Sequence, residues 1–134
     1  MSKVLSFITA LALVAGMFTS CDKHAYSIST NEYRCVLTDG SVTPVSDKKT
    51  YTIDKGQTLF FYASDHDGNR LTGGKYEPRI DEDQAGIVTA RAGSFDGDSC
   101  IEVTGKKAGM VTVMLNFTWR GFKLYKSARI QVNE

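Results

Sequence analysis

Two alternating segments near the end of the chain constrain the fold most strongly. In "GMVTVMLNFTWRG", residues 109–121, apolar side chains recur at every second position. They are Val111, Val113, Leu115, Phe117 and Trp119. The following segment, residues 122–132, repeats the period, with one face made of Phe122, Leu124, Ala128, Ile130 and Val132. A period of two is typical of a half-buried strand. Because Arg120-Gly121 supplies turn residues between the segments, they predict a β-hairpin.

The rest of residues 32–134 follows the same plan. Short runs rich in β-branched and aromatic residues, such as "KKTYTI" and "TLFFYAS", are separated by the turn signals "TDGS", "DKGQ", "DHDGNR", "TGGK", "SFDGDS" and "GKKAG". No segment carries a helical apolar stripe, although "RIDEDQAG" at 79–86 allows one helical turn. This spacing predicts an all-β sandwich or small barrel of about seven to nine short antiparallel strands.

The first 20 residues have the composition of a secretory signal peptide. Lys3 precedes an uncharged apolar run at residues 4–18, which is too short for a comfortable membrane span. The sequence Phe18-Thr19-Ser20-Cys21 resembles a bacterial lipobox, although leucine is commoner than phenylalanine at the first position. The resemblance implies that Cys21 is lipidated and becomes the first residue of the mature protein. The alternative is ordinary cleavage nearby, which would leave Cys21 as a free thiol.

We therefore expect a signal peptide at 1–20, a lipidated tether at 21–31 and one folded domain at 32–134. Several acyl chains would anchor the protein stably to a membrane. The expected location is the bacterial cell envelope, periplasmic or surface-facing. Without Lys3 the chain has 15 basic and 15 acidic residues, and this balance argues against a nucleic-acid partner.

Cys35 and Cys100 remain as an even pair in a secreted chain, which favours a disulfide. A bridge across a loop of about 65 residues would contribute about 4 kcal/mol in the chain-entropy description. The alternative is two separate buried thiols, since cysteine packs as a small apolar residue.

A family resemblance appears over residues 46–134. The strings "IDKGQTLFFYAS", "GIVTARAG" and "IEVTGKKAGMVTVMLNF" resemble the bacterial immunoglobulin-like domains of group 2. Gly56 and Thr58 match the lead-in to a long strand, and Gly105, Ala108 and Gly109 match the turn before the alternating strand. The resemblance implies an immunoglobulin-like β-sandwich. It implies no chemistry, because these residues make turns.

The most site-like string is Asp65-His66-Asp67-Gly68-Asn69. Asp65, Asp67 and Asn69 are a weak calcium candidate, because the helix-loop-helix calcium motif fails at its sixth and twelfth positions. An ordinary solvated turn explains the same residues. The acidic patches at 81–84 and 96–98 would need a cleft to act as an acid-base pair. The sequence shows no nucleophile motif and no phosphate loop, so we expect no cofactor, no other metal and no catalytic residue.

Aromatic residues near the last hairpin suggest a binding face. The hypothesis is that this face consists of Tyr62, Tyr76, Trp119, Phe122 and Tyr125. Aromatic residues next to Arg120 have a composition typical of interface hot spots. Core packing is the alternative, and it is favoured for Trp119 and Phe122. The candidate binding residues are therefore Asp65, Asp67, Asn69, Tyr76, Trp119, Arg120 and Tyr125.

Together these features predict a non-catalytic, membrane-anchored envelope lipoprotein that binds a protein or glycan partner. A peptidase inhibitor is one alternative, because immunoglobulin-like inhibitors of cysteine peptidases carry an Arg-Pro-Trp turn before the final strand. Here Trp119-Arg120 is reversed and lacks proline. A small glycan-acting enzyme is the other alternative, and it requires two carboxyl groups about 5–10 Å apart.

Overall fold

The computed structural model describes residues 32–134. The expected signal peptide, Cys21 and tether therefore lie outside the described residues. Those residues form an all-β sandwich, as the sequence predicts. The strands are β1 Glu32–Val36, β2 Val42–Pro44, β3 Thr50–Asp54, β4 Thr58–Ser64, β5 Lys75–Tyr76, β6 Arg79–Ile80, β7 Val88–Phe95, β8 Asp98–Gly105, β9 Gly109–Trp119 and β10 Phe122–Asn133.

The structure contains more strands than the seven to nine that the turn spacing suggests, because one edge is broken. β5 and β6 both pair with β9, and Glu77-Pro78 separates them. Proline has no N–H to donate to a ladder, so the edge strand is interrupted there. The predicted helical turn is present as the 3₁₀ helix η1, Glu82–Gln84. Within residues 32–134, no helix is long and apolar enough to cross a membrane.

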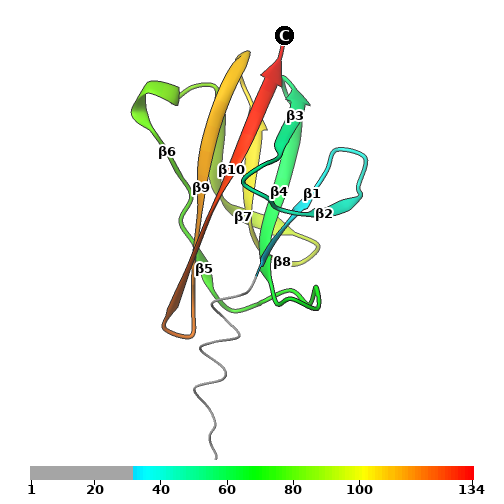
Figure 1. Cartoon of the computed structure of the whole chain (residues 1–134), viewed down its shortest axis with the longest axis vertical. Helices are drawn as coiled ribbons and strands as arrows, with labels where there is room; N and C mark the ends of the chain where they lie inside the picture. The colour runs from blue at the N-terminus through cyan, green and yellow to red at the C-terminus, as the bar shows by residue number, and fades with distance from the viewer. Residues whose placement is uncertain (1–31) are drawn as a thin grey trace, which may run out of the picture. The chain divides into compact units, whose positions relative to one another are not determined.

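Two sheets make up the sandwich (Figure 1). One has the order β2-β1-β4-β8-β7, and the other has the order β3-β10-β9-β5, with β6 also on β9. All pairs are antiparallel except β3 with β10, which is parallel. This parallel pair brings the first part of the domain beside the last strand.

The predicted hairpin is confirmed. β9 and β10 pair from Trp119↔Phe122 to Gly109↔Val132, and Arg120-Gly121 forms the two-residue turn. Arg120 has φ of 51° and Gly121 has φ of 82°. Positive φ at both central residues defines the type I′ turn, whose twist matches that of the flanking strands.

The core lies between the sheets, and most of the apolar residues predicted to share one face of β9 and of β10 belong to it. Val111, Val113, Leu115 and Phe117 of β9 are buried, as are Ala128, Ile130 and Val132 of β10. Trp119 is only partly buried, and Phe122 is 37% exposed because it lies at the hairpin tip. Phe61 of β4 is fully buried opposite this sheet. Burial of each such side chain stabilises the fold by about 1.5–3 kcal/mol.

The predicted disulfide is not formed, because both Cys35 and Cys100 are free thiols. Cys35 pairs with Phe61, and Phe61 pairs with Ile101, so β4 separates the two cysteine strands. Two strand spacings amount to about 10 Å, whereas a disulfide requires Cα atoms about 4.4–6.8 Å apart. Cys35 belongs to the core, whereas Cys100 points to the opposite face of the sheet, one residue out of phase with Ile101. The alternative of two separate buried thiols therefore holds.

Candidate functional site

One end of the sandwich gathers several of the predicted binding residues. Glu32 pairs with Ser64 at the end of β4, directly before the loop 65–74. That loop leads into β5, where Lys75 pairs with Thr118 beside the β9–β10 turn. The β7–β8 turn lies there too, because Arg70 Nη2 donates to the carbonyls of Asp98 and Ser99 at 2.9 Å each. We call this the loop end, made of residues 65–74, 96–97 and 119–121.

Within the loop end, the acidic loop (residues 65–69) is organised by its own first side chain. Asp65 Oδ1 accepts the N–H groups of Asp67 at 3.0 Å and Asn69 at 2.8 Å. Asp65 Oδ2 accepts the Asn69 side-chain amide at 3.2 Å. These bonds, with the Asn69 N–H first, lower the pKa of the Asp65 carboxyl. The carboxylate thus acts as a turn-stabilising group. In the part of the chain that the structure describes, no three acidic, histidine or cysteine side chains are grouped to hold a metal ion.

Trp119 and Arg120 also hold the loop end together. The Trp119 indole Nε1 donates to the carbonyl of Thr72 at 2.8 Å, which ties the hairpin tip to the loop 65–74. The Arg120 guanidinium lies over the indole ring, 4.5 Å from its centroid. Tyr62 has a similar role beneath Arg70, whose guanidinium carbon lies 4.5 Å from the ring centroid. The aromatic faces predicted to bind a partner are therefore partly covered by arginines of the same chain.

Tyr76 is a core residue, which corrects its place among the binding residues. Its side chain is only 4% exposed and stacks on Phe117 with ring centroids 4.2 Å apart. Its hydroxyl accepts the Ala63 N–H at 2.9 Å, a hydrogen bond between the two sheets. Burial raises the pKa of Tyr76 to about 12.

Tyr125 lies apart from the loop end on the outward face of β10. It is 64% exposed and pairs with Asn116 of β9. It borders a shallow hollow of about 160 Å³ together with Glu77, Arg79, Asn116, Phe117, Thr118 and Lys123. The seven predicted residues thus divide among the loop end, the core and an outer face, and they do not form one site.

The two acidic patches do not form a carboxylate pair with each other. The patch at 81–84 includes η1, which precedes β7, and the patch at 96–98 lies at the turn that follows β7. The eight residues of β7 separate them. At about 3.4 Å per residue this strand spans roughly 27 Å, well beyond the separation that a glycosidase needs.

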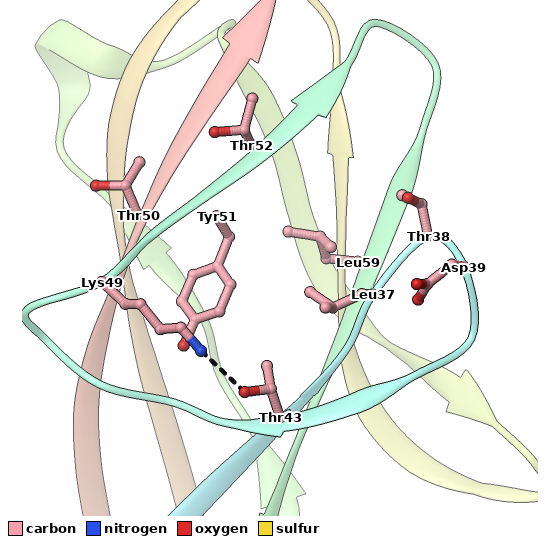
Figure 2. Close-up of a pocket in the computed structure, with 9 residues that line it drawn as sticks. All are labelled: Leu37, Thr38, Asp39, Thr43, Lys49, Thr50, Tyr51, Thr52 and Leu59. Atoms are coloured by element: carbon pink, nitrogen blue, oxygen red, sulfur yellow. Dashed lines mark hydrogen bonds between the residues drawn. The ribbon is translucent and has the colours of Figure 1, made fainter.

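A lateral cleft, which the sequence did not point to, lies on one side of the sandwich (Figure 2). It has a volume of about 370 Å³ and opens between β2 of one sheet and β3 of the other. The side chains of Tyr51 and Leu59, both buried, form its floor. The other lining residues are Leu37, Thr38, Asp39, Thr43, Lys49, Thr50 and Thr52.

Lys49 spans one side of the cleft. Its ammonium donates to Thr43 Oγ1 at 2.9 Å and lies 5.7 Å from the centre of the Tyr51 ring. Figure 2 shows it reaching from the start of β3 toward β2. Within residues 32–134 it forms no ion pair within 4.0 Å. Thr43 faces this ammonium, whereas Thr50 and Thr52 point from β3 to the side away from the Tyr51 ring (Figure 2). A hydroxyl and a cation over an apolar floor can hydrogen-bond and pack against a polar ligand.

The titratable groups of the cleft are all held in structural hydrogen bonds. The Ser41 hydroxyl and N–H, at 2.7 and 2.9 Å, lower the pKa of the Asp39 carboxyl. The Tyr51 hydroxyl donates to the Pro44 carbonyl at 3.1 Å and accepts the Ser46 N–H at 3.2 Å, and burial raises its pKa. No nucleophile with an adjacent base lies among the lining residues.

One sequence signal could have pointed to part of this cleft. "KKTYTI" alternates polar and apolar residues, so it predicts that Thr50 and Thr52 are exposed beside the buried Tyr51 and Ile53. The partners from β1, β2 and β4 could not be found this way, because their approach depends on the pairing of distant strands. No protein-family model matches the chain, and a search of curated proteins finds no match for it.

Proposed function

We propose that this protein is a non-catalytic, lipid-anchored envelope lipoprotein whose β-sandwich binds a protein or glycan partner in the lateral cleft. The observation that carries the proposal is the cleft itself, with an apolar floor and the Thr43 hydroxyl and Lys49 ammonium at its mouth. Its volume of about 370 Å³ lies in the range of ligand pockets, about 300–1,000 Å³.

Binding fits this cleft better than catalysis does. The Asp39 carboxylate is occupied by Ser41, and the Tyr51 hydroxyl is occupied by the backbone, so neither is poised to move a proton. The remaining polar groups are threonine hydroxyls and one ammonium. These groups suit the hydroxyls of a sugar or the backbone of a peptide, and they supply no chemistry of their own.

The position of the cleft also suits a tethered module. Glu32, the first residue of β1, lies beside the loop end, whereas Leu37 and Asp39 follow the other end of β1. With Cys21 lipidated, residues 21–31 would reach at most about 40 Å from the membrane. The five residues of β1 place the cleft about 17 Å farther along the domain. A partner in the envelope could then reach it.

Co-purification of the full chain from detergent-solubilised membranes tests the proposal. We expect a specific protein or glycan to remain bound to the wild type and to dissociate from Lys49→Ala. Lys55→Ala is the matched control, because Lys55 is an exposed lysine just beyond the opposite end of β3 and does not line the cleft. Equal retention by the two variants, or no retained partner on the wild type, would remove the cleft as the binding site.

A further inference from the structure

β7 is an edge strand whose main protection is charge. Its eight residues pair with β8 without interruption from Val88↔Gly105 to Phe95↔Asp98, and no bulge breaks the register. Among residues 32–134, only β8 pairs with it. Sheet edges are commonly blunted by proline, lysine, a bulge or short length. β7 has none of these features and carries one charged residue, Arg91.

Glu102 of the neighbouring strand reaches over this edge. Gly93 pairs with Cys100, and a Cβ atom on Gly93 would overlap the Glu102 carboxylate, so the carboxylate lies directly over the glycine. There it pairs with the Arg91 guanidinium at 3.2 Å and accepts the Ser94 N–H at 3.2 Å. The Arg91 side chain is 76% exposed and that of Glu102 only 19%. The space over Gly93 of β7 is therefore filled by the Glu102 carboxylate of β8.

Symmetry limits how a second copy could pair with β7. A two-fold axis perpendicular to the sheet pairs antiparallel strands and keeps each face on its own side. Paired residues must therefore share a face. A register that pairs all eight residues of β7 would set Val88 opposite Phe95, and these two side chains point to opposite faces, so this register is excluded. Two registers pair seven residues of each strand, one centred on Arg91 and the other on Ala92.

Charge distinguishes these two registers. The first places Arg91 opposite Arg91 of the second copy, and like charges directly opposite each other oppose pairing. The second places Arg91 opposite Gly93 of the second copy, over which the Glu102 carboxylate lies. Each Glu102 would then lie between two guanidinium groups, one from each copy. The same register sets Thr89 opposite Phe95, an aromatic and β-branched pair that favours sheet formation.

We propose that β7 is a homodimer edge, at which two copies join their five-stranded sheets antiparallel with Ala92 facing Ala92. The occupant is a second copy of this chain, because the charge pattern of the edge is complementary to itself only in this register. The dimer leaves the lateral cleft open, since the cleft is lined from the opposite edge of the sheet. The proposal does not depend on the cleft being a binding site.

A cysteine at the symmetry axis tests the register. In the full chain in detergent, Ala92→Cys brings two thiols within disulfide distance, because facing Cα atoms are about 4.5–5.5 Å apart. Ser94→Cys is the matched control on the same face of the same strand. Ser94 pairs with residue 90 of the second copy, so its two thiols lie about 13 Å apart along the strands. Mild oxidation with diamide at low protein concentration, followed by a non-reducing gel, measures the yield.

We expect Ala92→Cys to form a covalent dimer in at least fivefold greater yield than Ser94→Cys or the wild type. Adding Arg91→Glu to Ala92→Cys should reduce the yield to the level of the control, and adding Glu102→Arg as well should restore it. Absence of the Ala92→Cys dimer, or equal yields at the two positions, would overturn the proposal. Because the exchange also restores the Arg91–Glu102 pair within each chain, the melting temperature of every variant is measured alongside, and a low yield at an unchanged melting temperature identifies a lost interface.

Discussion

Replacing Tyr76 with phenylalanine should destabilise the domain, although only one oxygen is lost. The ring keeps its stack on Phe117, so the change isolates the hydroxyl. β4 pairs with β8 only from Thr58 to Phe61, and Ala63 lies beyond that ladder. Its carbonyl accepts the Leu71 N–H at 2.9 Å, and its N–H depends on the Tyr76 hydroxyl at 2.9 Å.

The expected cost follows from that buried N–H. Ala63 is fully buried, so water cannot replace the lost acceptor. An unsatisfied buried donor costs about 1–3 kcal/mol. For a domain of about 100 residues, each kcal/mol lowers the melting temperature by about 4–8 °C, so the expected decrease is about 4–24 °C.

Thermal unfolding followed by circular dichroism measures this decrease. Tyr125→Phe is the matched control, because Tyr125 is 64% exposed, and we expect its melting temperature to stay within about 1–2 °C of the wild type. If Tyr76→Phe melted with the wild type, Ala63 would not depend on this hydroxyl.

Three further outcomes are expected. Stability should fall above about pH 9 in alkaline urea titrations, because burial raises the pKa of Cys35 to about 12 and that of Cys100 to about 11. Below the unfolded-state pKa of about 8.5, each thiol is neutral in both the folded and the unfolded chain. As the pH rises from there toward the folded-state pKa, only the unfolded chain ionises, which favours unfolding. An unfolding free energy that stayed constant up to pH 11 would contradict the burial of these thiols. Calcium and chelator should give identical melting midpoints, since the Asp65 carboxylate is occupied within the acidic loop; a calcium-dependent rise would restore the metal site. Gly93→Ala should displace Glu102 and lower the melting temperature by several degrees, whereas Ala92→Gly on the same strand should have a smaller effect.

The fold could be predicted from local sequence because its decisive signals are local. The alternation of apolar residues in β9 and β10 indicates which face of each strand is buried, and Arg120-Gly121 indicates the turn that joins them. These signals need no knowledge of distant contacts. The interrupted edge at Glu77-Pro78 was missed because two-residue strands carry too little pattern to recognise.

The disulfide prediction failed for the opposite reason. It depended on the register of strands that are far apart in the chain, and a one-residue shift sends a side chain to the other face. Cys35 aligns through Phe61 with Ile101, so Cys100 is out of phase. An even number of cysteines in a secreted chain favours disulfides in general, but it contains no information about the strand register that decides whether two cysteines meet.

The functional residues were the hardest to predict, since polarity and aromaticity do not reveal what a side chain already contacts. Asp65 and Trp119 belong to residue types common at binding surfaces. In the structure their polar atoms are hydrogen-bonded to the acidic loop and to Thr72. Before they could bind a partner, these contacts would have to break, and the loop end would lose its order. In the lateral cleft the floor is already packed, and a partner would have to displace only the exposed hydrogen bond between the Lys49 ammonium and Thr43. For this reason we propose the cleft as the binding site, and the hydrogen bonds of Asp65 and Trp119 point to a structural role for the loop residues that most resemble a site in the sequence.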